Sequence, residues 1–304
     1  MPIGATRIFH VNVNCSDLSG SLAFYRDLVG LVPTTHTVPP PQPGAAFALP
    51  TAQWDAWILT DRRGYDGVAL DLLEWKTPAP TGRPYATPAH LGLARLGIQV
   101  RDLDALYDRL GAANIDCVGP PHPVELGGQV VARAFVAADP DGTLVEFTAG
   151  DDDSLSFVVV NCSDLDQSVR FYTETVGLHV RYRIGPVRHR GADLGLDGTV
   201  EWKGAVLDDG RDGDVFHLLV VETLTHRPPD SPYPSANHLG IFRLAMITED
   251  IDRDYAELEA RGVRCWSPPS RLAMGPGLPD LRALLFADPD GATLELIESP
   301  APSV

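Results

Sequence analysis

The chain contains two closely similar copies of one long segment. VNVNCSDLSGSLAFYRDLVGL begins at Val11, and VVVNCSDLDQSVRFYTETVGL begins at Val158, 147 residues later. HLGLARLGIQVRDLD at His90 returns as HLGIFRLAMITEDID at His238, and ADPDGTLVEF later returns as ADPDGATLEL. Because the blocks keep their order and nearly constant spacing, we interpret the chain as a tandem duplication. We place one domain at 1–149, a linker at 150–154 and a second domain at 155–304, which suits a chain of 304 residues.

The charge and the cysteines restrict the compartment and the partners. Acidic residues number 41 and basic residues 24, so binding of nucleic acid or of an anionic membrane is disfavoured. No apolar run approaches the roughly 18 residues of a membrane span, and the N-terminus lacks a signal-peptide pattern. The four cysteines occupy two matched pairs of positions, which is typical of small buried side chains rather than of a disulfide scaffold. We therefore predict a cytoplasmic protein with reduced thiols.

Each half of the sequence divides again into two similar units. The run 8–15 predicts a strand, and the spacing of Leu18, Leu22, Tyr25 and Val29 predicts one face of a helix after it. Further strand-like runs follow, and the same pattern begins again after a proline-rich linker. The order strand, helix and three strands is thus predicted four times, which makes an α+β chain of four βαβββ modules.

This order, with the motif DLxxSxxFY after the first strand and DPDGxxxE before the last, resembles the vicinal oxygen chelate superfamily. That superfamily contains glyoxalases, bleomycin-resistance proteins and extradiol dioxygenases. The resemblance covers nearly the whole chain. It implies two domains of two modules each, in which paired modules curl into an open barrel around a cavity that binds a small molecule. The chain can complete its cavities alone, so a monomer and a homodimer both stay open.

The resemblance also implies where metal ligands would lie, on the first and last strands of each module. The first half has four residues at these positions: His10, Glu74, Arg95 and Glu146. The second half has four at the matched positions: Phe157, Glu222, Arg243 and Glu295. Arginine stays protonated and offers no lone pair, so Arg95 and Arg243 would place a positive charge where a cation would lie. We expect no metal and no other cofactor, with weak metal binding at His10 as the alternative if Arg95 moves aside.

The strand positions expected to face the cavities are more polar in the first half. We compare four matched pairs: His10 with Phe157, Asn12 with Val159, Gln99 with Ile247, and Thr148 with Ile297. We therefore predict that the first-half cavity is the functional site.

Aromatic residues and loops give further candidates for ligand contacts. Trp54 and Trp202 match between the halves and are expected to be structural. Trp57 and Tyr65 have no aromatic counterpart and are expected to touch the ligand. The proline-rich loops 38–44 and 266–280 are candidates to cover cavity mouths.

Three functions stay open at this point. One is a metal-independent enzyme of lyase, isomerase or cyclase type, such as a tailoring enzyme of natural-product metabolism. In it His10, flanked by Glu74 and Glu146, moves a proton and Arg95 holds an oxyanion. The second is a protein that sequesters an antibiotic or an aromatic metabolite. The third is a metal-dependent glyoxalase or dioxygenase. A hydrogen-bonded core position for His10 and a purely structural ion pair for Arg95 are the simpler alternatives.

Overall fold

The computed structural model describes residues 2–211, 216–226 and 232–298. These residues form four modules that share the order strand, helical segment and three strands, and the first module has one further strand of two residues. The α+β architecture of four βαβββ modules predicted from the sequence is therefore confirmed.

The first half of the chain forms modules 1 and 2. Module 1 consists of β1 (Ala5–Cys15), α1 (Leu18–Leu22), η1 (Ala23–Leu28), β2 (Val32–Thr37), β3 (Gln42–Pro43), η2 (Ala45–Phe47), β4 (Thr51–Thr60), η3 (Gly64–Asp66) and β5 (Ala69–Thr77). Module 2 consists of β6 (Gly92–Val100), α2 (Leu103–Ala112), β7 (His122–Leu126), β8 (Gln129–Ala138) and β9 (Leu144–Ala149).

The second half forms modules 3 and 4. Module 3 consists of β10 (Ser154–Asn161), α3 (Leu165–Arg170), η4 (Phe171–Val176), β11 (His179–Arg190), η5 (Gly191–Leu194), β12 (Thr199–Asp208) and β13 (His217–Thr223). Module 4 consists of β14 (Gly240–Thr248), α4 (Ile251–Ala260), β15 (Ser270–Leu272), β16 (Leu281–Ala287) and β17 (Thr293–Glu298). Strand β10 begins at Ser154, the last residue of the predicted linker.

The first helix of each half starts as predicted but then changes its winding. Asp17 caps α1 by accepting a hydrogen bond from the backbone N–H of Ser19. After Leu22 the chain continues as the π-helical segment η1, where the sequence predicted a single α-helix. The Tyr25 hydroxyl in this segment donates a hydrogen bond to buried Asp139, at 3.0 Å. Because Asp139 lies in the DPDG turn of module 2, this bond ties modules 1 and 2 together.

The two sheets combine modules from different halves. One sheet has the order β15-β16-β17-β14-β1-β5-β4-β2 and the other the order β11-β12-β13-β10-β6-β9-β8-β7. Module 1 therefore shares a sheet with module 4, through antiparallel pairing of β1 with β14, and module 2 shares one with module 3. We assigned each cavity to one half of the sequence, and the strand order corrects this assignment. A repeat shows which strands are alike, but it does not show which of them pair.

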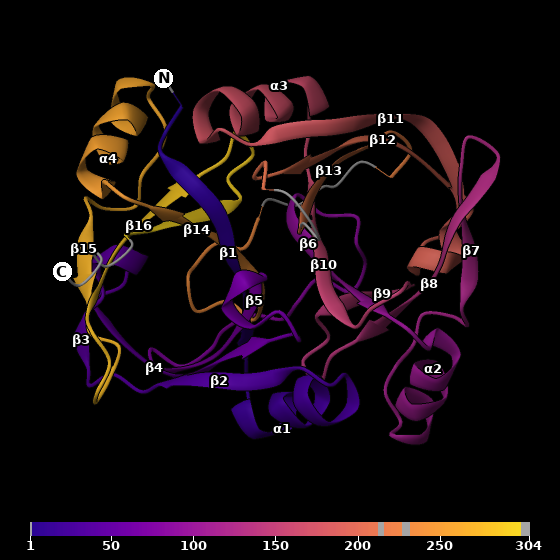
Figure 1. The fold of residues 1–304 in the computed structure, drawn as a ribbon, viewed down its shortest axis with the longest axis horizontal. Coiled ribbons are helices and arrows are strands. Elements are labelled where there is room, and N and C mark those ends of the chain that lie inside the picture. The colour runs from indigo at the N-terminus through magenta and orange to yellow at the C-terminus, as the bar shows by residue number, and fades with distance from the viewer. Residues whose placement is uncertain (1, 212–215, 227–231, 299–304) are drawn as a thin grey trace.

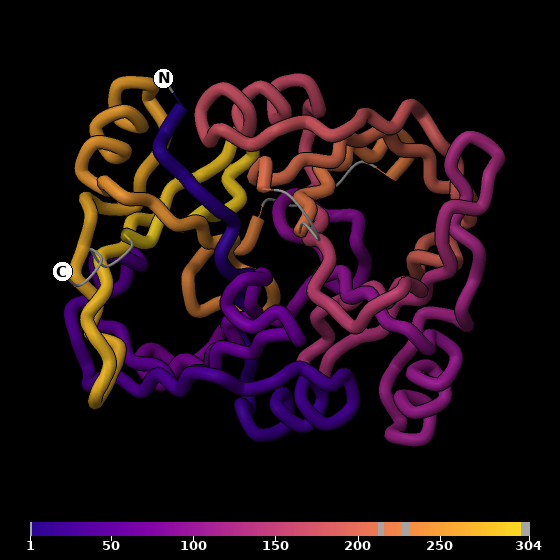
Figure 2. The backbone as a smooth tube through the Cα atoms, viewed as in Figure 1, coloured from indigo at the N-terminus to yellow at the C-terminus, as the bar shows by residue number. Residues whose placement is uncertain are grey.

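The sheets curve so that each leaves a concave face free. In Figure 1 the strands surround two open regions side by side, with helices α1–α4 on the outside of the molecule, and Figure 2 shows the same path of the chain. The outer face of each sheet packs against these helices around one continuous set of buried apolar side chains. The concave faces are thus left to form cavities. Within the described residues, no helix has both the length and the apolarity needed to cross a membrane.

Candidate functional site

The sheet of modules 1 and 4 encloses a cavity of about 510 Å³, which we call the β1 cavity. Four buried polar side chains meet at one end of it, each from a different strand: His10 from β1, Asp71 from β5, Arg243 from β14 and Glu295 from β17. These strands are neighbours in the sheet, so residues far apart in the sequence reach the same place on its concave face.

Arg243 lies between the two carboxylates. Its Nη2 is 2.7 Å from Asp71 Oδ2, and its Nε is 2.7 Å from Glu295 Oε2. His10 Nε2 lies 3.3 Å from Glu295 Oε2 and 3.8 Å from Asp71 Oδ2. Asn12 Nδ2 donates a hydrogen bond of 3.2 Å to Asp71 Oδ2. One buried cation thus orients two buried carboxylates, and the imidazole stands beside both of them.

The charges of this cluster stabilise one another. Burial opposes the ionisation of Glu295, but the positive charge of Arg243 and the proximity of His10 outweigh it and hold the pKa of Glu295 at about 2. Burial likewise opposes the charge on Arg243, and the Glu295 and Asp71 carboxylates more than compensate, so the pKa of Arg243 is raised. The Glu295–Arg243 pair is therefore ionised at neutral pH.

Several polar atoms of the cluster are buried without a hydrogen-bond partner among the described residues. They are both ring nitrogens of His10, Nη1 of Arg243 and Oδ1 of Asn12. Buried polar atoms are nearly always hydrogen-bonded, and leaving one unsatisfied costs about 1–3 kcal/mol. His10 and Arg243 also line the cavity. These unsatisfied hydrogen-bonding atoms therefore indicate that a polar group of a ligand binds at this end of the β1 cavity.

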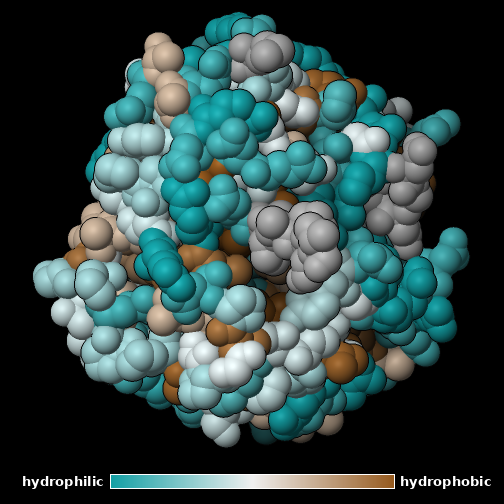
Figure 3. All heavy atoms as spheres, turned by 60° about the vertical axis from the view of Figure 1, so that its left-hand side comes forward, coloured by the Kyte–Doolittle hydropathy of each residue, from teal (hydrophilic) through white to brown (hydrophobic). Residues whose placement is uncertain are grey.

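The remainder of the β1 cavity is largely apolar. Phe47 and Trp54 form part of the wall, and the Phe47 ring centre lies 5.8 Å from Arg243 Cζ. Tyr65 stacks on Phe9 with ring centres 6.4 Å apart, and both line the cavity. The predicted covering loop 266–280 contributes lining residues, among them Met274, Leu278 and Pro279. Figure 3 turns this side of the molecule forward and shows hydrophobic residues inside depressions of a mainly hydrophilic surface.

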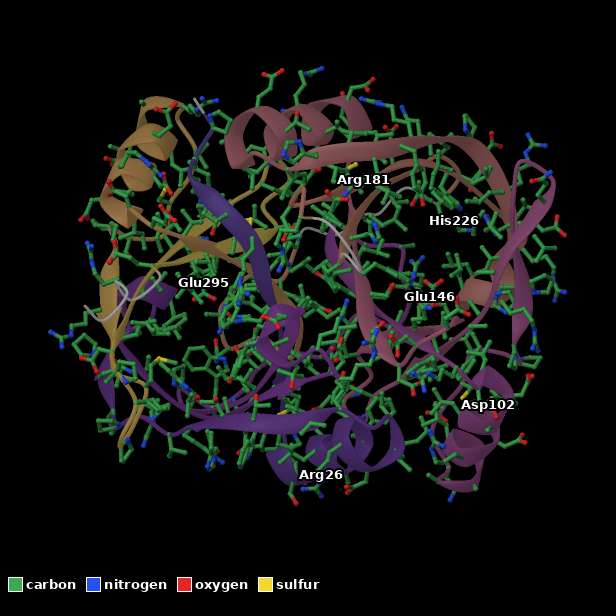
Figure 4. All side chains as sticks on the ribbon, viewed as in Figure 1. Arg26, Asp102, Glu146, Arg181, His226 and Glu295 are labelled. Carbon is green, nitrogen blue, oxygen red and sulfur yellow. The ribbon has the colours of Figure 1, made fainter. Side chains whose placement is uncertain are left out.

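The sheet of modules 2 and 3 encloses a second cavity of about 620 Å³, which we call the β10 cavity. It contains five of the residues predicted from the sequence: Arg95, Gln99, Glu146, Thr148 and Phe157. The prediction that Arg95, Glu146, Gln99 and Thr148 share a cavity with His10 is therefore wrong. In Figure 4, Glu295 and Glu146 lie in the interiors of opposite sides of the molecule. The polarity comparison fails for the same reason, since Ile297 lies in the β1 cavity while Gln99 and Thr148 lie in the other.

Two predicted site residues, Glu74 and Glu222, lie on the helix-covered face of the sheets. Glu74 accepts a hydrogen bond of 3.0 Å from the backbone N–H of Leu18, and Glu222 accepts one of 2.9 Å from Leu165. They also pair with Lys76 and Lys203. Side chains alternate along a strand, so Glu74 points away from the face that carries Asp71 and Leu73. Asp71, three residues earlier on the same strand, is the cavity residue that the sequence reasoning missed.

The positions of two tryptophans relative to the β1 cavity differ from those expected. Trp54, expected to be structural, lines the β1 cavity and donates a hydrogen bond of 3.0 Å to Thr37 Oγ1. Trp57, expected to touch the ligand, stacks on His36 with ring centres 4.4 Å apart and packs against the core on the other face. Tyr65 lies in the cavity as predicted.

The donor set of the β1 cavity does not fit a resident metal ion. The available donors are His10, Asp71 and Glu295, but Arg243 already bridges the two carboxylates through the oxygens that face it. A divalent cation there would have to displace or sit beside the guanidinium, which cannot lose its proton. In the described part of the chain, no group of three or more His, Cys, Asp or Glu residues is arranged to hold a metal.

Comparisons with known proteins agree with this architecture. The model of the "Glyoxalase/Bleomycin resistance protein/Dioxygenase superfamily" matches residues 7–147 and 154–296. A 2-epi-5-epi-valiolone epimerase from Actinomyces sp is 34% identical over 152 residues, covering 47% of this chain and 78% of the relative. A lactoylglutathione lyase from Arabidopsis thaliana is 22% identical over 298 residues, covering 96% of this chain and 92% of the relative. The crystal structure of glyoxalase I from Zea mays aligns with a TM-score of 0.67 and 18% identity, covering 96% of this chain and 92% of that one, and it shows the shared fold.

Proposed function

The chain belongs to the Glyoxalase/Bleomycin resistance protein/Dioxygenase superfamily, and on that premise we propose that it is a metal-independent isomerase or lyase. In this proposal it moves a proton on a small organic molecule bound in the β1 cavity. The observation that carries the proposal is that both ring nitrogens of His10 and Nη1 of Arg243, two residues that line the cavity, are buried without a hydrogen-bond partner among the described residues. His10 can accept a proton, and Arg243 can stabilise a negative charge.

Arg243 is suited to hold an oxygen that becomes negative during the reaction. Its Nε and Nη2 are fixed by Glu295 and Asp71, which leaves Nη1 as the donor without a partner in the part of the chain that the structure describes. A donor held in place before the reaction stabilises developing charge without reorganising. The substrate would place a carbonyl oxygen at Nη1, and Arg243 thus takes the role that we assigned to Arg95 from the sequence.

His10 is suited to accept the proton. When the imidazole takes a proton from the carbon beside that carbonyl, the C–H electron pair moves into the carbonyl and forms an enolate on Arg243. The imidazolium lies 3.3 Å from Glu295 Oε2 and 3.8 Å from Asp71 Oδ2, and these carboxylates stabilise its charge. Return of the proton from His10 to the neighbouring carbon yields a positional isomer, and delivery of a proton from water to the opposite face yields an epimer while His10 gives its proton to solvent. If the enolate electron pair instead expels a leaving group from the next carbon, the product is that of a lyase.

The cavity wall supports a small, partly apolar substrate, and one relative supports an isomerase reaction. Side chains such as Phe47, Trp54 and Leu272 exclude water from the polar end and thereby strengthen its electrostatic interactions. The similarity to an epimerase from Actinomyces sp favours an isomerase of natural-product metabolism, because that relative is named for an epimerisation.

The experiment is solvent-deuterium exchange. Candidate α-hydroxy ketones are incubated with the protein in D2O, and loss of the α-proton signal is followed by proton NMR. We expect His10→Gln to lower the exchange rate by about 10²-fold or more. His217→Gln is the matched control, because His217 lines the β10 cavity and its change should leave the rate unaltered. Equal rates for His10→Gln and the wild type would reject the assignment of His10.

Sequestration of an aromatic compound is the second candidate, and the aromatic wall residues Phe9, Phe47, Trp54 and Tyr65 favour it. Stoichiometric binding of a compound whose α-protons never exchange would support this function instead. Exchange that is abolished by a chelator and restored by a divalent metal would support a metal-dependent glyoxalase or dioxygenase.

A further inference from the structure

The β10 cavity repeats the framework of the β1 cavity but lacks one of its carboxylates. Arg95 and Glu146 occupy the positions of Arg243 and Glu295, and they form the corresponding ion pair. Asp71 pairs in register with Asn12 on β1, whereas Leu219 pairs with Val159 on β10. Leu219 lines the cavity at the place that corresponds to Asp71.

Arg95 is consequently less neutralised than Arg243. Arg243 has two carboxylate partners, whereas Arg95 has one, Glu146, among the residues that the structure describes. The Arg95 side chain is 13% exposed and lines the cavity, compared with 5% for Arg243. In the β1 cavity, Asp71 covers one edge of the Arg243 guanidinium. The corresponding edge of the Arg95 guanidinium has no carboxylate beside it among the described residues and is open to the β10 cavity.

A second, independent group also lacks a partner in this cavity. The Nε2 atom of His189 is buried without a hydrogen-bond partner in the described chain. His189 lines the β10 cavity and stacks on Trp202, with ring centres 5.7 Å apart. Burial lowers the pKa of His189, so at neutral pH the ring is uncharged and its N–H can donate to an anion.

The remaining lining contains both polar and apolar side chains. The other carboxylate that lines the cavity is that of Asp193. It lies 3.9 Å from Arg190 Nε and pairs with that arginine, not with Arg95. Gln99 and Thr148 provide further hydrogen-bonding groups, and the apolar lining comes from residues such as Phe157, Trp202 and Leu219. A ligand here would present one acidic group to Arg95 and an apolar body to the walls.

We propose that the β10 cavity is a second binding site, distinct from the reaction site, for a small monocarboxylate with an apolar or aromatic body. The ligand carboxylate pairs with Arg95 and takes the place that Asp71 occupies beside Arg243. This proposal concerns a different cavity and does not depend on the function proposed for the β1 cavity.

The test is isothermal titration with 2-naphthoate and with 2-naphthamide, which have the same aromatic body but differ in charge. We expect 2-naphthoate to bind about ten-fold or more tightly than 2-naphthamide, because a charge-assisted pair is formed only by the acid. Equal affinities, or no binding of either probe, would overturn the proposal.

Variants then locate the carboxylate. Arg95→Gln should remove the preference for 2-naphthoate, whereas Lys203→Gln should keep it, since Lys203 pairs with Glu222 on the other face of the sheet. Leu219→Asp should also abolish binding of the acid by supplying the missing carboxylate from the protein. Leu219→Asn has nearly the same shape without the charge and should retain binding.

The folded state of each variant is checked by circular dichroism. Retained preference in Arg95→Gln, or equal losses in Leu219→Asp and Leu219→Asn, would overturn the proposal. A preference that disappears in Lys203→Gln as well would also overturn it, because it would then reflect net charge rather than the Arg95 site.

Discussion

Replacement of Arg243 by methionine removes the cation that holds the β1 cavity together. Methionine keeps much of the apolar volume of the side chain, but Asp71 and Glu295 are then left buried without their shared partner. Removing one member of a buried ion pair typically costs about 3–5 kcal/mol, because the remaining charge is uncompensated. We expect a loss of this size in the free energy of unfolding at pH 7.5.

The pKa of Glu295 gives a second route to the magnitude. In the wild type it is about 2 in the folded protein, compared with 4.5 for an ordinary glutamate. Linkage converts this difference into about 3 kcal/mol of stability, which is present above pH 4.5 and is lost as the pH falls towards 2. Both routes therefore predict a similar cost.

The pH dependence distinguishes this cause from simple loss of packing. In Arg243→Met, burial without a cation raises the pKa of Glu295, so the folded variant takes up a proton on this carboxylate as the pH falls from 7.5 to 5. The stability difference between wild type and variant should therefore shrink on acidification. Asp139 and Asp288, whose pKa burial raises to about 6, change both proteins alike and cancel in the difference.

Urea unfolding followed by tryptophan fluorescence at pH 7.5 and pH 5 measures this difference. Arg95→Met is the matched control and should cost less, because Arg95 is more exposed and has one carboxylate partner, Glu146, among the described residues. A loss below about 1 kcal/mol for Arg243→Met, or a loss that does not change with pH, would refute the reasoning.

Two further predictions test the corrected site. Asp71→Asn should lower the rate of α-proton exchange about ten-fold or more, because Arg243 is then held less firmly. Glu74→Gln should leave the exchange rate unchanged. A larger loss of exchange in Glu74→Gln than in Asp71→Asn would restore Glu74 as the site residue. Trp54→Ala should weaken ligand binding in the β1 cavity about ten-fold or more, while Trp57→Ala should alter only stability. Titration of both variants with the same ligand measures the two affinities. Equal affinities of the two variants would contradict the assignment of the cavity wall.

The repeated modules were predictable because strands, helices and turns depend on local patterns. The DLxxSxxFY and DPDG motifs mark the same structural points in both halves, where Tyr25 bonds Asp139 and Tyr172 bonds Asp288. The choice of partner strands was not predictable in this way. Strands β1 and β10 occupy equivalent places in the repeat, and only the assembled chain determines that β1 pairs with β14 and β10 with β6.

The candidate site was partly predictable for a related reason. His10, Arg243 and Glu295 were each predicted to face a cavity, but they were assigned to different cavities. The acidic residue on β5 was misjudged because the run from Asp71 to Glu74 contains acids on both faces of the strand. A shift in strand register exchanges the two faces, and the sequence of one strand alone does not reveal which face is concave.

The most direct test of a metal-independent reaction at His10 and Arg243 is α-proton exchange by protein from which metals have been removed. The protein is dialysed against a chelator, its metal content is checked by elemental analysis, and exchange of the best candidate substrate is followed in D2O. The proposed function predicts the same rate before and after treatment. A rate that falls with the metal content and returns when a divalent metal is added would contradict it.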